Sequence, residues 1–185
     1  MDEDTKYLIE VNKENLERVI KFVDVLDGKA KFILTLVLAL TAYLVTQLEP
    51  YLGAHGKWGT FTTWAPPFFV VLDAMVIGCL GCFIAAAITV ICAISPRTDQ
   101  HSGRTSPIFF GTIAKSPLED FKKTMGLITP NQVIDQLADQ TYDNAKIVAR
   151  KTAYVLRSIK LFYYGMACFF VFTIGRPLLL SLVAR

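Results

Sequence analysis

The residues best suited to chemistry in this sequence are several basic side chains and a pair of aromatic ones. The basic residues are Arg97, Arg104, Lys146, Arg150 and Lys151, and the aromatic pair is Phe109 and Phe110. Guanidinium and ammonium groups bind a phosphate through charge-assisted hydrogen bonds, while an aromatic ring stacks on a base. The combination favours a site for an anionic nucleotide. Two alternatives stay open: the basic residues of the 146–160 segment could contact anionic lipid, and the phenylalanines could be packing core.

Motifs for other chemistry are missing from the sequence. It contains only two histidines, His55 and His101, and it has no glycine-rich phosphate loop and no nucleophile motif. Carboxylates that could be paired into acid–base schemes are expected on helix surfaces, where salt bridges are the default role; they are Asp24, Asp27, Asp135, Asp139 and Asp143. We therefore expect no enzyme and no catalytic residues.

The cysteines lie inside apolar segments, where neither disulfides nor a soluble zinc site are expected. Cys79 and Cys82 have the Cys-x-x-Cys spacing, but small residues also recur here at every fourth position, at Gly78, Cys82 and Ala86. Such spacing favours close packing of helices in lipid. We therefore expect helix contacts here, with no metal and no cofactor.

The amino-acid composition indicates the class of protein to which these residues belong. Of 185 residues 53% are hydrophobic, mean hydropathy is +0.42, and 19% are charged. A net charge of +3 does not favour binding to a nucleic-acid polymer. The pattern predicts an all-α membrane protein with about three transmembrane helices, a cytoplasmic helical stalk and an insert.

The expected segments follow the hydropathy. Residues 1–29 are expected to form a cytoplasmic amphipathic helix, 30–48 the first span, 49–65 an external loop, and 66–94 the second span. Residues 95–160 then form a cytoplasmic insert and a long helix, and 161–184 form a third span that is broken at Gly175, Arg176 and Pro177. Lys29, Lys31 and Arg97 outnumber the one lysine of the 49–65 loop, so the positive-inside rule places the N-terminus in the cytoplasm.

Two charged residues inside the spans, Asp73 and Arg176, are expected at similar depth. Each is costly alone in lipid, and a salt bridge between them would join the second and third spans. Separate snorkelling of each side chain to the outer headgroups is the alternative.

Two helix starts are expected on the cytoplasmic side. Thr129 as N-cap, Pro130 in the first helical position and Gln132 in the third form a capping box for a helix that could continue into the third span. A shorter helix is expected with Ser116 as N-cap and Gly126 at its end.

The chain resembles the transmembrane effectors of the bacterial Pycsar antiphage systems. The resemblance is carried by "DGKAKF" (27–32), "SPR" (95–97), "SPIFFGTI" (106–113), Phe121 and "NAKIVARKTAYVLR" (144–157), and it covers about residues 10–175. Its family-typical positions are Asp27, Lys29, Arg97, Phe109, Phe110, Gly111 and Lys151.

The resemblance implies an antiviral defence protein that crosses the cell inner membrane several times. It also implies that the protein senses a cyclic nucleotide. A partner pyrimidine nucleotide cyclase would make cyclic UMP (cUMP) or cyclic CMP (cCMP). Binding would make the protein, expected as a homo-oligomer, impair the membrane as an abortive infection response, through a change in assembly or in helix angle. The alternatives are a non-signalling membrane scaffold that recruits a soluble partner through its cytoplasmic helices, and a channel, for which the spans offer few polar residues.

Overall fold

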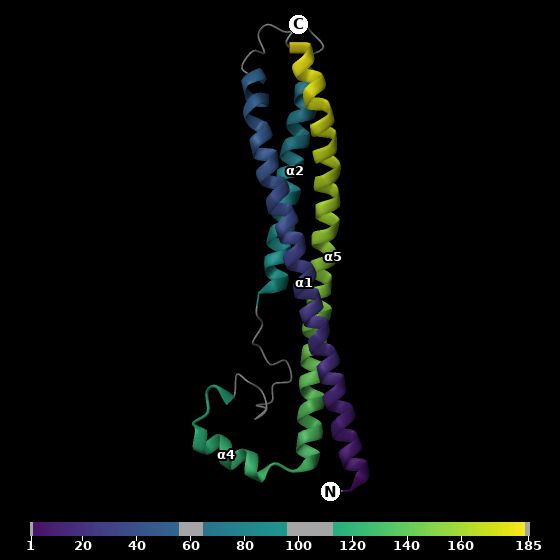
Figure 1. Cartoon of the computed structure of the whole chain (residues 1–185), viewed down its shortest axis with the longest axis vertical. Coiled ribbons are helices and arrows are strands. Elements are labelled where there is room, and N and C mark those ends of the chain that lie inside the picture. The colour runs from purple at the N-terminus through teal and green to yellow at the C-terminus, as the bar shows by residue number, and fades with distance from the viewer. Residues whose placement is uncertain (1, 56–64, 96–112, 184–185) are drawn as a thin grey trace. The chain divides into compact units, whose positions relative to one another are not determined.

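The computed structural model describes residues 2–55, 65–95 and 113–183, and this part of the chain is helical with short connecting turns. The helices are α1 (Glu3–His55), α2 (Ala65–Ile94), α4 (Leu118–Leu127) and α5 (Pro130–Val183) (Figure 1). α1, α2 and α5 are each long and apolar enough to cross a membrane. The predicted all-α class is confirmed, with three helices that could span a membrane.

Two of these helices each join two of the segments expected from the sequence, and for α5 the sequence had indicated this continuation. α1 joins the N-terminal amphipathic segment to the first span without a break, and its start is capped by Asp2, whose Oδ1 accepts the Thr5 backbone N–H at 3.0 Å. Hydrogen bonding to Thr5 holds the pKa of the Asp2 carboxyl below its ordinary value. α5 joins the long cytoplasmic helix to the third span in the same way.

The expected break at Arg176 and Pro177 is wrong, because α5 continues to Val183 with Pro177 inside it. Proline removes one backbone hydrogen bond, but helices in lipid tolerate it where neighbouring helices and local adjustments satisfy the freed carbonyl. A single proline or glycine is therefore a weaker signal of a helix end inside an apolar segment than in a soluble helix.

The capping box of α5 is confirmed. The Thr129 backbone N–H donates to Gln132 Oε1 at 2.8 Å, and the Gln132 N–H donates to Thr129 Oγ1 at 3.4 Å. The Ser116 cap is wrong: Pro117 is the N-cap of α4, with no side-chain hydrogen bond, and its carbonyl accepts the Phe121 N–H at 3.0 Å. Ser116 instead closes a turn by donating its N–H to Ile113, and Gly126 lies within the last turn of α4.

The chain divides into two compact units. The first comprises Met1–Gly28 and Ser95–Thr152, and the second comprises Lys29–Ile94 and Ala153–Arg185. Each long helix apart from α2 contributes to both units.

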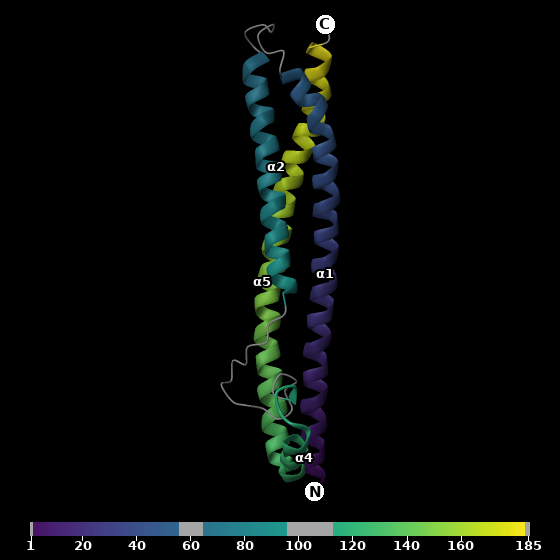
Figure 2. The same cartoon turned by 90° about the vertical axis from the view of Figure 1, so that its left-hand side faces the viewer.

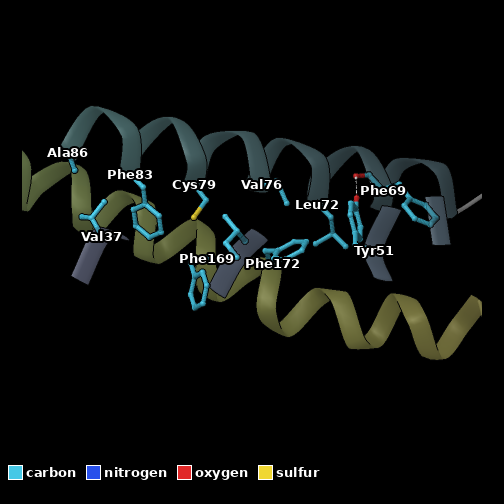
Figure 3. Packing of buried hydrophobic residues seen from close by; sticks show 11 residues of the cluster. Val37, Tyr51, Phe69, Leu72, Val76, Cys79, Phe83, Ala86, Phe169 and Phe172 are labelled. Carbon is cyan, nitrogen blue, oxygen red and sulfur yellow. Dashed lines mark hydrogen bonds between the residues drawn. The ribbon is translucent and has the colours of Figure 1, made fainter. Parts of the chain in front are cut away.

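The second unit is a three-helix bundle of α1, α2 and α5, which run side by side in both views (Figures 1 and 2). The buried residues of α2 alternate in steps of three and four along the whole helix: Phe69, Leu72, Val76, Cys79, Phe83, Ala86, Val90 and Ala93. On α1 the most buried residues recur every seventh position, at Ala30, Val37, Leu44 and Tyr51. This is the heptad spacing of coiled-coil packing, and Figure 3 shows the resulting row of contacts.

The remaining surface of the bundle is apolar and exposed. Ile77 is 71% exposed, Ile174 65% and Phe32 64%. In water a continuous apolar surface of this kind would promote association, whereas lipid tails solvate it at no cost. The exposed faces of the second unit therefore fit a bilayer.

A glycine fixes the closest approach within the bundle. A Cβ added at Gly165 of α5 would lie 2.5 Å from Cε1 of Phe83 and 3.3 Å from Cβ of Cys82 on α2. Only glycine fits at such a distance, so Gly165 sets the spacing of α2 and α5.

The first unit has a much thinner core. Of its described residues only Leu137 and Lys151 are fully buried, and many of its apolar residues are half-buried or exposed. α1 and α5 lie side by side and parallel here (Figures 1 and 2), and α4 exposes all of its apolar residues at least partly. Polar contacts therefore contribute a large share of the interactions that hold the helices of this unit together.

Candidate functional site

The first unit brings together an ion pair from two segments of the sequence that lie far apart. Lys151 Nζ lies 2.6 Å from Asp27 Oδ1, and the side chains are 6% and 27% exposed. A lysine charge this deeply buried persists because the carboxylate compensates its lost hydration. The pair fixes α1 to α5 at one register.

This pairing alters what Lys151 can do. The sequence made Lys151 a candidate phosphate ligand, but in this structure its ammonium is buried and bound by Asp27. Asp27 has the salt-bridge role expected for a helix carboxylate, although its partner lies on another helix and its side chain is only 27% exposed. Both residues lie in the segments that carry the family resemblance, "DGKAKF" and "NAKIVARKTAYVLR".

Two other basic candidates of α5 remain accessible. Lys146 is half-buried and its Nζ lies 4.3 Å from the centre of the Tyr142 ring, and Arg150 is exposed. A cation over an aromatic face keeps most of its hydrogen-bond donors free for an anion. These two side chains can therefore meet a phosphate arriving at the surface of α5.

Two polar atoms of the same helix are buried without a partner. Gln140 Nε2 and Asp143 Oδ1 have almost no exposed surface and make no hydrogen bond within the described part of the chain. The sequence interpretation placed Asp143 on a solvated helix surface, and for its Oδ1 that is wrong. A buried carboxylate oxygen without a donor is costly, so it marks this turn of α5 as unusual.

The other predicted ligand residues, Arg97, Arg104, Phe109, Phe110 and Gly111, lie outside the described residues. The insert segment that was expected to supply the aromatic pair is therefore placed only from Ile113 onward.

In the second unit, the two charged residues expected to pair with each other bind neutral groups of α1 instead. Asp73 accepts a hydrogen bond from the Tyr51 hydroxyl at 2.7 Å, and Arg176 donates to the Gln47 side-chain oxygen. Among the ion pairs between described residues, none joins Asp73 to Arg176, so the expected bridge is not formed. The outcome follows from the register, because Gln47 and Tyr51 are one turn apart on the helix that packs against both α2 and α5.

These contacts make a polar layer in an otherwise apolar core. The Tyr51 hydroxyl also donates to the Phe69 carbonyl at 3.4 Å (Figure 3), and its ring meets Phe172 edge-on at 5.4 Å. Tyr51 thus contacts both other helices. The sequence analysis missed it, because it placed Tyr51 in the expected external loop, residues 49–65.

Two of the small-residue positions of α2, Gly78 and Cys82, lie near α5, and the third, Ala86, is fully buried in the bundle. A Cβ added at Gly78 would lie 3.5 Å from Cys168 Sγ, an ordinary contact. Cys82 is near Gly165, as noted above. The four cysteines are unpaired thiols, and no group of three potential metal ligands occurs in the ranges that the structure describes.

Fold and site together define a multi-helix membrane protein whose second unit fits lipid and whose first unit carries buried and exposed polar groups. Comparison with known families gives the more specific assignment: the family described as "Pycsar effector protein domain" matches residues 12–176. The chain belongs to this family of antiphage defence effectors. No curated protein and no solved structure matches the chain.

Proposed function

We propose that this protein senses a cyclic pyrimidine mononucleotide, cUMP or cCMP, and then impairs the bacterial inner membrane as an abortive infection response. The observation that carries the proposal is the family match, which spans both units of the chain from residue 12 to residue 176. A partner pyrimidine nucleotide cyclase would supply the ligand after infection. The protein itself acts by binding and has no catalytic step.

The construction of the two units supports a division of labour. The second unit has the apolar exposed surface of a membrane-embedded bundle, with three helices in heptad contact. The first unit has a thin core in which an ion pair and unpartnered polar atoms are prominent. Weakly packed elements change conformation at low cost, so the first unit is the better candidate for the part that responds to ligand.

A ligand shifts such an equilibrium only through its different affinity for the two states. α1 and α5 each pass from the first unit into the second without a helix break. A ligand-induced change in the packing of α1 against α5 would therefore reach the spans through two continuous helices. Small-residue contacts such as that of Gly165 with Phe83 are positions where the spans would have to repack.

The first test is calorimetric binding of cUMP, cCMP, cyclic AMP and cyclic GMP to the detergent-solubilised full chain. Selective binding of one pyrimidine cyclic nucleotide is expected. In cells that express the protein, raising that nucleotide with a cyclase should depolarise the inner membrane, as measured with a potential-sensitive dye. Well-folded protein that binds none of the four nucleotides would contradict the proposal.

The orientation proposed places the N-terminus in the cytoplasm. It rests on Lys29 and Lys31, both exposed on α1 at the start of the apolar segment. Two single cysteines, Lys6→Cys and Leu52→Cys, in a variant without the four native cysteines, distinguish the two faces of the membrane. In sealed inverted vesicles, whose cytoplasmic face is outward, an impermeant maleimide should label Lys6→Cys and leave Leu52→Cys unlabelled. Labelling of Lys6→Cys in intact spheroplasts would contradict the orientation.

One surface favours the alternative function as a scaffold. α1 carries a shallow depression lined by Arg18, Lys21, Phe22 and Val25, and Phe22 is 62% exposed. A soluble partner could cover it, and so could another copy in the homo-oligomer that we propose as the active assembly. Crosslinking that gives only self-products with wild type, and none with Phe22→Glu, would support the oligomer over the scaffold.

A further inference from the structure

The unpartnered atoms of Gln140 and Asp143 form a complementary pair. Gln140 Nε2 is a hydrogen-bond donor and Asp143 Oδ1 is an acceptor, and both are buried within the first unit without a partner in the described chain. Residues three apart lie on the same face of a helix, so the donor and the acceptor are neighbours one turn apart. Each atom left in this way destabilises the fold unless another molecule completes its hydrogen bonds.

The local sequence sets this turn apart from the rest of α5. The residues between Ala138 and Ala145 read "DQTYDN", whereas the flanking turns supply Leu137 on one side and Ile147 and Val148 on the other to the buried face. A helix selected only for packing would continue its apolar face through this turn. Breaks of packing rules of this kind occur where function requires them.

We propose that Gln140 and Asp143 bind the hydrogen-bonding edge of the base of the activating nucleotide. Gln140 Nε2 would donate to the ring nitrogen of cytosine or to a carbonyl of uracil, and Asp143 Oδ1 would accept from the amino group of cytosine or the ring N–H of uracil. Side-chain amides and carboxylates read bases in this way in other complexes. The inference rests on the proposed function, since it assigns a contact for the ligand named there.

The same helix offers cations for the other end of such a ligand. Arg150 lies seven residues after Asp143, so it falls on nearly the same face about 10 Å along the axis. Lys146 lies between them, held over the Tyr142 ring. Lys151 is committed to Asp27, which leaves Arg150 and Lys146 as the phosphate ligands on α5.

An ordered water could also satisfy the two atoms, and it would leave them with a structural role only. The two cases differ in what apolar replacement does. Where a water bridges the pair, replacing both side chains removes stabilising hydrogen bonds from the ligand-free protein. Where the pair has no partner until a ligand binds, replacing both side chains removes two unpaired buried atoms. The ligand-free protein then keeps or gains stability, while binding is lost.

The test is a double variant, Gln140→Met with Asp143→Leu, in the full chain in detergent. We expect an unfolding temperature equal to or above that of wild type, and an affinity for cUMP and cCMP weaker by about tenfold or more. The matched control is Asp135→Leu, an exposed carboxylate on the same helix, which should bind as wild type does. Asp143→Asn keeps the side-chain shape and should weaken binding by about threefold or more, because it removes the charge from one hydrogen bond.

The possible results separate the two proposals. Wild-type affinity in the double variant, or in Asp143→Asn where the double variant does not fold, overturns the base-edge contact and leaves nucleotide sensing intact. A lower unfolding temperature with unchanged affinity also overturns it, in favour of a bridging water. If wild type binds no cyclic nucleotide, the proposed function fails first and this inference fails with it.

Discussion

Neutralising Asp27 while Lys151 stays in place would leave a buried ammonium group without its carboxylate. The two atoms lie 2.6 Å apart, and the Lys151 side chain is only 6% exposed. Removing one partner of a fully buried pair costs roughly 3–5 kcal/mol, and because Asp27 is 27% exposed we expect about 2–3 kcal/mol here. For a chain of this size one kcal/mol corresponds to roughly 2–4 °C, so Asp27→Asn should unfold roughly 4–12 °C below wild type.

The double variant Asp27→Asn with Lys151→Met supplies the decisive comparison. It removes the orphaned charge as well and leaves two uncharged side chains, so it should recover most of the lost stability. Thermal unfolding followed by circular dichroism in one detergent, at one heating rate, gives the comparison even where unfolding is irreversible. Asp24→Asn, an exposed carboxylate one turn earlier on α1, is the control.

Two results would refute this reasoning. The first is an Asp27→Asn protein that unfolds together with wild type, since the buried ammonium would then need no carboxylate. The second is a double variant that is less stable than Asp27→Asn, since Lys151 would then stabilise the unit through something other than the pair.

Three further changes test the packing and the caps. Gly165→Ala places a Cβ 2.5 Å from the Phe83 ring and should destabilise the bundle by about 1–3 kcal/mol. The control Gly81→Ala, whose added Cβ meets nothing within 4 Å, should have an unfolding temperature equal to or above that of wild type. Thr129→Ala removes half of the capping box and should cost about 1 kcal/mol, seen as faster amide exchange in the first turn of α5; unchanged exchange would contradict the cap. Tyr51→Phe removes a 2.7 Å hydrogen bond to a carboxylate in the bundle and should cost about 1–3 kcal/mol of stability, and an equal unfolding temperature would show that the hydroxyl is dispensable.

Much of the fold was predictable because its signals are local. The capping box around Thr129 needs only residues three apart, and the three long helices follow from long apolar and amphipathic segments. The local signal failed where two residues competed for one role. Ser116 and Pro117 both suit a helix start. The N-cap of α4 is Pro117, and Ser116 lies in the preceding turn, where its backbone N–H donates to the Ile113 carbonyl.

The contacts between helices were not predictable from hydropathy. α2 is apolar on every side, so its sequence does not reveal that Phe69, Leu72 and Val76 face inward while Ile77 faces outward. The choice depends on the partner helices, and so does the choice of Tyr51 as the partner of Asp73. Charge alone suggested Arg176 for that role, although a neutral hydroxyl at the right register is the nearer donor.

The polar candidates show what a sequence pattern can and cannot say about a site. A face that changes from apolar to polar for about two turns, as in "DQTYDN", can be a solvated surface or a buried polar site, and periodicity does not distinguish them. The structure distinguishes them for Asp143, whose Oδ1 is buried without a donor, and for Asp27, whose carboxylate is bound by Lys151. Burial and satisfaction of hydrogen bonds carry information that residue type lacks.

The buried positions of α5 continue one heptad pattern from the first unit into the second, at Lys151, Val155, Ser158, Gly165, Phe169 and Phe172. A polar residue at a seam position fixes the register of a helix pair at some cost in stability. Lys151 does this at the end of the first unit, where its ion pair specifies which turn of α1 it meets. A ligand that altered the packing of α1 against α5 in the first unit would therefore have to work against a register fixed by this ion pair. This makes the Asp27–Lys151 pair the contact in the first unit whose strength would set how readily the ligand-free protein changes state.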